Sequence, residues 1–299
     1  MSVNYPMNYL NTLKLDLKFN EPLKDYTTFK IGGPAQVLVK PGDTAELQAL
    51  IKVLIENGEK FFVLGCGSNL LISDEGFKGV VISLRQGEFL RIEENGVELK
   101  IGAGVKLSAL LGFCVKNGFS GLEFAAGIPA SVGGAVKRNA GIKQRCMADV
   151  VKDITYIDNA GEVKTLIEPE LKFRYRGLDL DMAAITAVTL RLAKIKPGNV
   201  AKKIRGFFDL KMSTQPLSEK SAGCIFKNPQ TGSAGRLIEE AGLKGKRVGG
   251  ARVSEKHANF IINENNATAE DVLRLIDIVK EEVKLKKNII LQPEVDILA

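Results

Sequence analysis

Tryptophan is absent from the chain, and histidine occurs only once, at His257. The four cysteines, Cys66, Cys114, Cys146 and Cys224, lie far apart and form no Cys-x-x-Cys pair. This spacing argues against a zinc site and a disulfide framework, and it favours a reducing compartment. No apolar run approaches the roughly 20 residues of a membrane-spanning helix, and the first residues contain no apolar segment of signal-peptide type. We therefore expect a cytoplasmic protein with neither a membrane span nor a metal site.

Neither sign of charge dominates the chain, which has 42 Lys and Arg against 35 Asp and Glu and a net charge of +7. A positive balance suits an anionic partner, either nucleic acid or a phosphorylated small molecule. Nucleic acid is the less favoured of the two, because no stretch is a dense basic run and tryptophan is missing. At 299 residues the chain is too long for one core of ordinary size, so we expect two or three domains.

Hydrophobic periodicity predicts several helices. An apolar stripe (Leu47, Leu50, Ile51, Leu54 and Ile55) follows Asp43 and Glu46, a capping-box pair, and ends before Gly58. A second helix is expected to end at Gly118. Three more are expected near residues 200–212, 233–241 and 268–285, the last of them capped by Thr268 and Asp271.

Strand signals are mixed in among the helices. Asn95-Gly96 predicts the tip of a hairpin whose second strand alternates Val97, Leu99 and Ile101 with charged residues. A second hairpin is expected over residues 153–167, and strands over 184–195 and 289–298. Residues 196–200, "KPGNV", are typical of a domain boundary. Helices and hairpins alternate irregularly, which favours an α+β fold over a doubly wound sheet.

Two glycine-rich stretches stand out. "GCGSNLL" (65–71) follows a buried strand, but Gly76 and Gly79 interrupt what comes next, so it is not a Rossmann loop opening into a helix. A plain structural turn is the alternative. The second stretch, residues 121–141, has the sequence "GLEFAAGIPASVGGAVKRNAG" and is expected to be an ordered loop. Two such loops in adjacent segments favour one extended ligand, such as a dinucleotide, lying between them.

Seven motifs occur in order: "YTTFKIGGPAQ", "GCGSNLL", "GLEFAAGIPASVGGAV", "FRYRGLD", "SAGCIFKNP", "AGRLIEEAGLKGKRVGGARVSEKHANFIIN" and "LQPEV". From about residue 20 onward the chain resembles the UDP-N-acetylenolpyruvoylglucosamine reductase (UDP-N-acetylmuramate dehydrogenase) family, in its shorter subfamily. The resemblance implies a three-domain α+β flavoenzyme. Its FAD-binding fold would be of the vanillyl-alcohol oxidase and p-cresol methylhydroxylase type, divided at residues 1–84, 85–197 and a substrate domain at 198–299.

The resemblance also implies the cofactors and the reaction. FAD would be bound non-covalently, with its pyrophosphate on Gly65, Cys66, Gly67, Ser68 and Asn69, and with the flavin lined by Gly127, Ser131, Gly133 and Gly134. NADPH would reduce the flavin. The reduced flavin would then deliver hydride to the enolpyruvyl ether of UDP-N-acetylglucosamine enolpyruvate, giving UDP-N-acetylmuramate for peptidoglycan synthesis. A monomer is expected.

Three residues carry the catalytic expectation. Arg176 of "FRYR" matches the position that stabilises the substrate carboxylate, a task suited to a planar and permanently charged guanidinium. Glu294 of "PEV" would assist the intermediate by a hydrogen bond and is expected to be a buried, perturbed carboxyl. Cys224 stands where most family members have serine and would donate the proton. A thiol of ordinary pKa, about 8.5, stays protonated near neutrality unless nearby cations ionise it.

Tyr175, Lys227 and Asn228 match substrate-binding positions, the last two beside the diphosphate. Lys137-Arg138 replace the usual aromatic residue and methionine after the second loop, and His257 is interpreted as structural because no metal-ligand partner accompanies it. Two alternatives remain open. One is a flavin oxidoreductase with another substrate, and the other is a nucleotide-binding homologue that has lost turnover.

Overall fold

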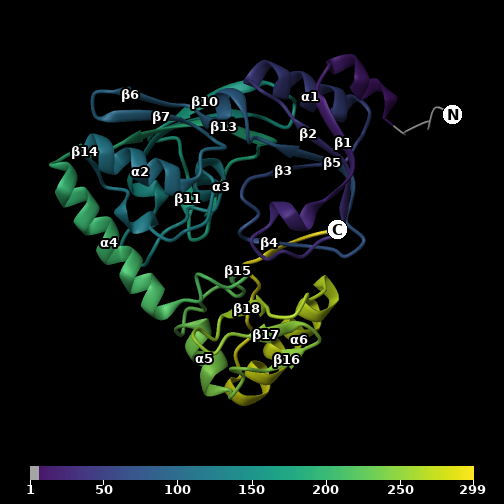
Figure 1. Ribbon diagram of the computed structural model, residues 1–299, viewed down its shortest axis with the longest axis vertical. Helices are drawn as coiled ribbons and strands as arrows, with labels where there is room; N and C mark the ends of the chain where they lie inside the picture. The colour runs from purple at the N-terminus through teal and green to yellow at the C-terminus, as the bar shows by residue number, and fades with distance from the viewer. Residues whose placement is uncertain (1–6) are drawn as a thin grey trace. The chain divides into compact units, whose positions relative to one another are not determined.

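The computed structural model describes residues 7–299, which form two compact units (Figure 1). Unit 1 holds the described residues up to Phe19 together with Val37–Gly65 and Gly79–Phe208. Unit 2 holds Asn20–Gln36, Cys66–Lys78 and Asp209–Ala299. The chain therefore passes from one unit to the other inside "GCGSNLL", between Gly65 and Cys66. The division into three domains at residues 84 and 197 remains a prediction.

The strands and helices mix irregularly along the chain, so the α+β class is confirmed. The strands are β1 Asp16–Pro22, β2 Pro34–Lys40, β3 Phe61–Leu64, β4 Leu70–Ile72, β5 Phe77–Ser83, β6 Ile92–Asn95, β7 Glu98–Gly102, β8 Phe119–Ser120, β9 Val151–Ile157, β10 Val163–Ile167, β11 Phe173–Arg174, β12 Gly177–Leu178, β13 Ala184–Arg191, β14 Ala193–Lys194, β15 Ser221–Cys224, β16 Arg247–Val248, β17 Ala251–Val253, β18 Phe260–Asn263 and β19 Asp296–Leu298. The α-helices are α1 Thr44–Glu56, α2 Leu107–Asn117, α3 Val132–Lys137, α4 Pro197–Thr214, α5 Ala234–Glu240 and α6 Ala269–Lys287. Five short 3-10 helices are η1 Asn8–Leu13, η2 Leu23–Tyr26, η3 Gly87–Leu90, η4 Glu123–Ala125 and η5 Met147–Asp149 within the described part of the chain.

Helix α1 begins where the sequence predicts. The Asp43 carboxylate accepts the Glu46 N–H at 2.8 Å, which satisfies one of the donors that every helix start leaves open. The reciprocal half of the capping box is shifted by one residue, because the Glu46 carboxylate accepts from Gly42 N at 2.6 Å. Four stripe residues are buried (Leu47, Leu50, Ile51 and Leu54), whereas Ile55, the last residue of the predicted stripe, is 39% exposed at the last turn of the helix.

The predicted hairpin at residue 95 forms, with a different tip. Asn95 pairs with Glu98, so the two central turn residues are Gly96 and Val97. Gly96 has φ +61°, the conformation that glycine adopts most readily at the first central position of a two-residue turn. Val97 therefore lies in the turn, 46% exposed, rather than on the strand. The other hairpin is confirmed, with β9 and β10 paired antiparallel.

Unit 1 is built on the five-stranded sheet β10-β9-β13-β7-β6, and the sheet β1-β2-β5-β3 carries β3 parallel to β5. A helix, α3, lies within residues 121–141, where the sequence was interpreted as a loop. Ser131 caps this helix, and Gly133 allows it to lie close to β7, since a Cβ on Gly133 would come within 2.8 Å of the Ala103 Cβ. The missing side chain at Gly133 thus allows α3 to pack closely against the backbone around Ala103.

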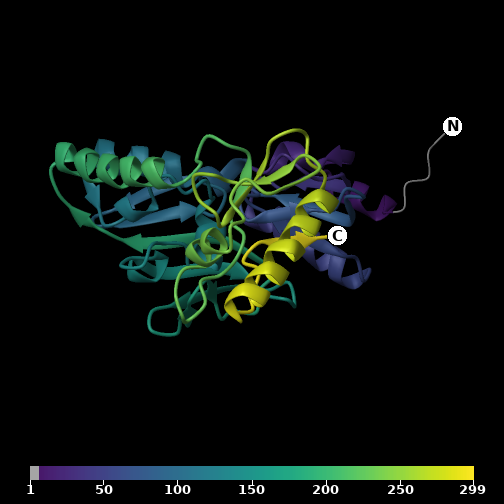
Figure 2. The same cartoon turned by 90° about the horizontal axis from the view of Figure 1, so that it is seen from below.

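Unit 2 contains the antiparallel sheet β15-β18-β17-β16, with α6 packed against β16 and β17 (Figures 1 and 2). The capping box of α6 is confirmed, since Thr268 and Asp271 bond each other's backbone N–H. The strand predicted over residues 289–298 is reduced to β19, which pairs parallel with β4. Before β19, Pro293 forms only an isolated bridge with Phe226, since proline has no N–H to extend a ladder.

Each unit has its own core. The buried side chains of unit 1 include Leu50, Ile82 and Val188, and those of unit 2 include Phe226 and Ile276. Among the described residues, no helix is both long and apolar enough to cross a membrane.

Candidate functional site

The glycine-rich turn of unit 2 is fixed by its backbone. Gly67 has φ +62°, and a Cβ at this position would lie 2.5 Å from the Tyr26 carbonyl oxygen. The Gly67 carbonyl accepts the Thr28 N–H at 3.3 Å. Any residue with a side chain would be both strained and obstructed here, so the turn requires glycine. Thr28 therefore helps to hold the turn. Thr28 was not among the predicted site residues, although it lies in the "YTTFKIGGPAQ" motif.

The same turn offers donors. Within residues 7–299, the N–H groups of Gly67, Ser68 and Asn69 have no hydrogen-bond acceptor. Consecutive N–H groups in a tight turn form a concave site that suits an anion. This donor set fits the diphosphate of a dinucleotide such as FAD.

The turn is also tied to the C-terminal segment of unit 2. The Asn69 side chain donates to the Glu294 carbonyl at 2.9 Å, and the Asn69 carbonyl accepts from Asp296 N at 3.0 Å. Two predicted site residues distant in sequence, Asn69 and Glu294, are thus brought together. The Glu294 side chain is only half-buried, so the expectation of a buried carboxyl was wrong.

The second glycine-rich segment lies in unit 1 beside Gly65. A Cβ on Gly65 would come within 2.6 Å of the Ser131 Oγ, which accepts from Gly134 N at 3.3 Å. The Arg85 guanidinium donates to the Gly65 carbonyl at 2.9 Å. Gly65, Ser131 and Gly134 therefore form one group in unit 1, and the absence of a side chain at Gly65 is a requirement of close packing.

The first N–H groups of α3 already have partners, since Val132 N donates to Val105 O at 2.8 Å and Gly133 N to Ala103 O at 2.9 Å. These two N–H groups therefore cannot also donate to a phosphate. Gly134 is exposed, which leaves a surface free of side chains that a flat ring could lie against. Gly127, at φ +74°, ends the tight turn that follows η4.

Tyr175 and Arg176 form the two-residue turn between β11 and β12. Arg176 has φ +59°, and its Nη1 donates to the Gly141 carbonyl at 3.3 Å. Its guanidinium lies 5.4 Å from the centre of the Tyr175 ring, within the range of a cation–π contact. Tyr175 is 59% exposed. The turn thus presents an aromatic ring and a guanidinium side by side in unit 1.

Asn139 anchors this turn and was missed as a separate site residue. Its Nδ2 donates to the Arg174 carbonyl at 3.0 Å, and its Oδ1 accepts from Ala148 N at 3.0 Å. Asn139 itself is buried with φ +43°, a conformation that asparagine tolerates better than most residues. The signal in the sequence was "NAG", the last three residues of the second glycine-rich stretch.

Cys224 ends β15 in unit 2, where it pairs with Phe260 of β18. The thiol-bearing residue is half-buried, between the buried Ala222 and Ile225. The next residues turn toward the C-terminal segment: Ile225 O accepts from Glu294 N at 2.7 Å, and Lys227 N donates to Gln292 O at 2.9 Å. The residues that directly follow Cys224 are therefore joined by backbone bonds to the segment that contains Glu294, within unit 2.

Asn228 has a structural contact that the sequence did not indicate. Its Oδ1 accepts the Ala234 N–H at 3.0 Å, at the first residue of α5. Asn228 is exposed, and this bond leaves its Nδ2 as the group able to donate to a ligand.

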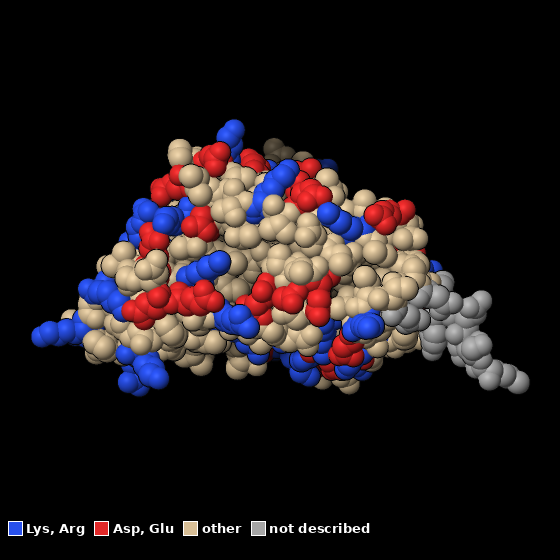
Figure 3. All heavy atoms as spheres, turned by 90° about the horizontal axis from the view of Figure 1, so that it is seen from above, with Lys and Arg blue, Asp and Glu red and all other residues tan. Residues whose placement is uncertain are grey.

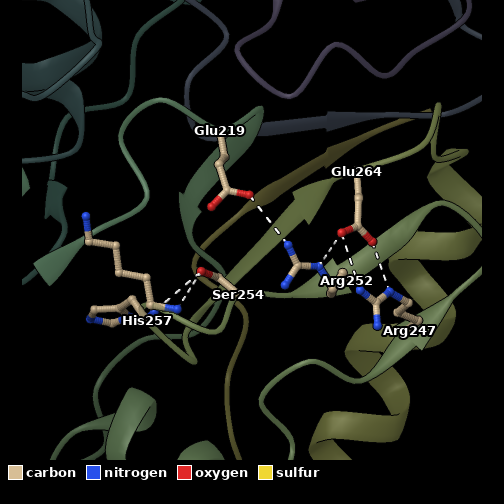
Figure 4. A network of polar contacts seen from close by, with 7 residues as sticks. Glu219, Arg247, Arg252, Ser254, His257 and Glu264 are labelled. Carbon is tan, nitrogen blue, oxygen red and sulfur yellow. Dashed lines mark hydrogen bonds and ion pairs between the residues drawn. The ribbon is translucent and has the colours of Figure 1, made fainter.

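Ion pairs join charged side chains of the sheet β15-β18-β17-β16 and of its connecting segments in unit 2 (Figure 4). Arg252 lies 2.8 Å from Glu264 and 3.8 Å from Glu219, and Arg247 bonds Glu264 at 2.9 Å. The bond from Arg247 lowers the pKa of Glu264, with Arg252 adding to the effect. Elsewhere the charges are mixed, and Figure 3 shows both signs interspersed on the face that it draws. Within the described part of the chain, no group of three or more His, Cys, Asp or Glu residues could hold a metal ion.

Comparison with known proteins gives two family matches. A family model described as "UDP-N-acetylenolpyruvoylglucosamine reductase, C-terminal domain" matches residues 215–298, and one described as "FAD binding domain" matches residues 35–167. A UDP-N-acetylenolpyruvoylglucosamine reductase from Moorella thermoacetica is 43% identical over 95% of this chain and 94% of its own. One from Bacillus subtilis is 40% identical over 93% of each.

Solved structures agree. The crystal structure of UDP-N-acetylenolpyruvylglucosamine reductase from Thermus caldophilus matches with a TM-score of 0.82 and 38% identity, over 95% of this chain and 99% of that one. Physcomitrella patens BBE-like 1 shares the fold alone, with a TM-score of 0.50 and 16% identity over 62% of this chain and 44% of that one. The predicted FAD-binding fold of the vanillyl-alcohol oxidase type is confirmed.

Proposed function

Because the chain belongs to the UDP-N-acetylenolpyruvoylglucosamine reductase family, we propose that it reduces UDP-N-acetylglucosamine enolpyruvate to UDP-N-acetylmuramate, with NADPH as the hydride source and FAD as the cofactor. The product is a precursor of peptidoglycan. The observation that carries the proposal is the match to named relatives over nearly the whole chain, supported by the three acceptor-free N–H groups of Gly67, Ser68 and Asn69.

Residues Gly65 to Asn69 would hold the FAD diphosphate, and the segment that contains Gly127, Ser131, Gly133 and Gly134 would face the flavin. The chemistry that bound FAD would supply there is hydride transfer between NADPH and the methylene carbon of the enolpyruvyl group. Donors in the turn of unit 2 and the side-chain-free surface at Gly134 support this assignment.

Arg176 would hold the substrate carboxylate and stabilise the negative charge that develops beside it. A guanidinium fits this task because two parallel N–H donors match a carboxylate and the charge persists at every physiological pH. The bond from Arg176 to the Gly141 carbonyl and its contact with the Tyr175 ring support a fixed orientation of the guanidinium. Tyr175 would then line the substrate with its exposed ring.

Cys224 would hold the proton that the second carbon of the former double bond receives. Hydride and proton together convert the enolpyruvyl ether into a lactyl ether, and water would return the proton to the thiolate. Glu294, with its carboxyl protonated, would donate a hydrogen bond to the developing enolate. Lys227 and the free amide nitrogen of Asn228 would bind the substrate diphosphate by charge and by donation.

The proposal includes three further expectations: a monomer, a location in the cytoplasm, and three domains divided at residues 84 and 197. Gel filtration at several concentrations tests the first.

The function is tested by the visible spectrum of the purified protein under anaerobic conditions. A yellow flavin that bleaches with NADPH and regains colour only on addition of UDP-N-acetylglucosamine enolpyruvate supports both half-reactions. Bleaching without recovery contradicts the proposed substrate, and it favours a flavoprotein that acts elsewhere or has lost turnover. A colourless protein that gains no flavin on incubation with FAD contradicts the cofactor assignment.

A further inference from the structure

One buried asparagine holds the backbone that follows Cys224. The Asn259 carbonyl accepts the Ile225 N–H at 2.8 Å, its Oδ1 accepts the Phe226 N–H at 2.9 Å, and its Nδ2 donates to the Phe226 carbonyl at 2.8 Å. Asn259 is 3% exposed. The amide orientation is fixed by chemistry, because an N–H can face only the oxygen and a carbonyl only the nitrogen.

The other edge of the same backbone is held by the segment that carries Glu294. Ile225 O accepts from Glu294 N at 2.7 Å, and Lys227 N donates to Gln292 O at 2.9 Å. Phe226 forms an isolated antiparallel bridge with Pro293. Residues 225–227 are therefore a short spacer, with Asn259 on one edge and the Glu294 segment on the other.

We propose that Asn259 is a positioning residue, which sets the distance between the Cys224 thiol and the Glu294 carboxyl by fixing the Ile225–Phe226 backbone. This inference rests on the proposed function, because it concerns the groups assigned to the protonation step. Proton transfer depends steeply on geometry, and a displacement of about 1 Å can reduce a rate by roughly 10²-fold.

Asn259 is itself held from the preceding turn. The Ser254 Oγ accepts from Lys256 N at 3.2 Å and from His257 N at 3.4 Å (Figure 4). The His257 Nδ1 then accepts the Asn259 N–H at 3.3 Å. The turn leaves Asn259 little freedom, so its side chain can act as a rigid spacer.

Only a group that both donates and accepts can replace the amide. In an Asn259→Asp variant, a carboxylate accepts from Phe226 N but repels the Phe226 carbonyl. A protonated carboxyl restores the donor. Burial raises the pKa of such a carboxyl, so the defect should shrink as the pH falls.

The first experiment separates the two half-reactions by anaerobic rapid mixing. In Asn259→Ala the reduction of the flavin by NADPH should be unchanged, and its reoxidation by UDP-N-acetylglucosamine enolpyruvate should slow by roughly 10²-fold. In Asn259→Asp the reoxidation rate relative to wild type should rise as the pH is lowered. If Asn259→Ala does not fold, the pH dependence of the reoxidation rate in Asn259→Asp tests the inference instead.

A second readout does not need turnover. In the protein without FAD, amide hydrogen exchange should accelerate in peptides covering residues 224–228 and 291–296 of the Asn259 variants. Asn263→Ala is the matched control, because Asn263 is also buried in this strand region, accepts from Ala267 N at 2.8 Å and donates to Phe29 O at 3.1 Å.

The Asn263 control should lose stability without changing the ratio of the two half-reaction rates. The inference is wrong if the Asn259 variants slow both half-reactions equally, if neither slows, or if Asn263→Ala alters the ratio in the same way. If the wild-type protein reduces no enolpyruvyl ether, the proposed function is wrong. The hydrogen-exchange data then test by themselves whether Asn259 holds residues 224–228 and 291–296 in place.

Discussion

Arg176 shows how one backbone angle can orient a side chain for which we propose a function. A positive φ costs an ordinary residue about 1 kcal/mol or more, because its Cβ approaches the neighbouring carbonyl. Arg176 adopts φ +59° in a two-residue turn, where glycine or asparagine would be easier. Two bonds support this conformation: Asn139 donates to the Arg174 carbonyl, and the Arg176 guanidinium donates to the Gly141 carbonyl. Sequence patterns located the arginine through its motif, but the strain and its support come only from the fold.

At Cys224 we expect Cys224→Ser to keep most of the substrate-dependent reoxidation of the flavin, because a hydroxyl in the same place can still donate a proton. Cys224→Ala should lose roughly 10²–10⁴-fold, the usual contribution of a positioned general acid. Anaerobic rapid mixing with substrate measures both variants, and reduction by NADPH serves as the internal control. Wild-type rates in both variants would exclude Cys224 as the donor.

His257 gives the molecule one histidine-dependent pH response. Burial lowers the pKa of His257, and Lys244 adds to this, whereas Glu239 and a backbone bond oppose it. The folded state therefore prefers the neutral ring, and the stability that this provides is present above the unfolded pKa of about 6.5 and is lost as the pH falls below it. Urea unfolding at about pH 7.5 and about pH 5.5 should show a decline that His257→Gln reduces. An equal decline in both proteins would contradict the assignment.

Among the elements, those with local signals were predicted best. The start of α6 was recognised because Thr268 and Asp271 lie three residues apart, within reach of each other's N–H. The same helix has a second cap that no local pattern indicates: the Asp74 carboxylate accepts from Ala269 N at 2.8 Å and Glu270 N at 3.1 Å. Asp74 lies 195 residues before Ala269. Caps contributed by distant residues follow from the fold and cannot be read from spacing.

Helix α3 was hidden by its glycines, which usually disfavour a helix. Gly133→Ala should destabilise unit 1 by about 1–3 kcal/mol, the usual cost of overpacking, because the new Cβ would lie 2.8 Å from that of Ala103. It should also weaken retention of FAD, measured as the flavin-to-protein absorbance ratio after gel filtration. Gly112→Ala in α2 is the control: its Cβ would meet nothing within 4 Å, so it should gain up to about 1 kcal/mol. Equal effects of the two changes would contradict the packing argument.

For the molecule as a whole, motif order identified the family but not how the chain is shared between the units. Unit 2 combines Asn20–Gln36 and Cys66–Lys78 with the last third of the chain. No change in composition at residues 20, 36, 66 or 78 marks these crossings. They depend on long-range pairing, such as Asn263 Nδ2 to Phe29 O at 3.1 Å. Local periodicity has no information about such contacts.

The pairing of β19 with β4 should matter to the glycine-rich turn. Asp296→Pro removes the N–H that donates to the Asn69 carbonyl at 3.0 Å. We expect it to destabilise the protein by about 1–3 kcal/mol and to reduce FAD retention. Asp296→Ala keeps the N–H and removes the side chain, so it separates the backbone effect from the side-chain effect. Thermal unfolding and the flavin absorbance ratio report both, and equal losses in the two variants would exclude the backbone bond as the cause.

The parallel pairing of β4 with β19 also sets an order of events during synthesis. Leu71 of β4 pairs with Ile297, so β4 emerges from the ribosome more than two hundred residues before its partner exists. Contacts this distant form late, and until they form Leu71, fully buried in the finished protein, has no partner strand to cover it. The turn at Gly67–Asn69 gains its last backbone restraint only when residue 296 has been made. A dinucleotide that needs this turn would therefore be taken up after translation has passed that point.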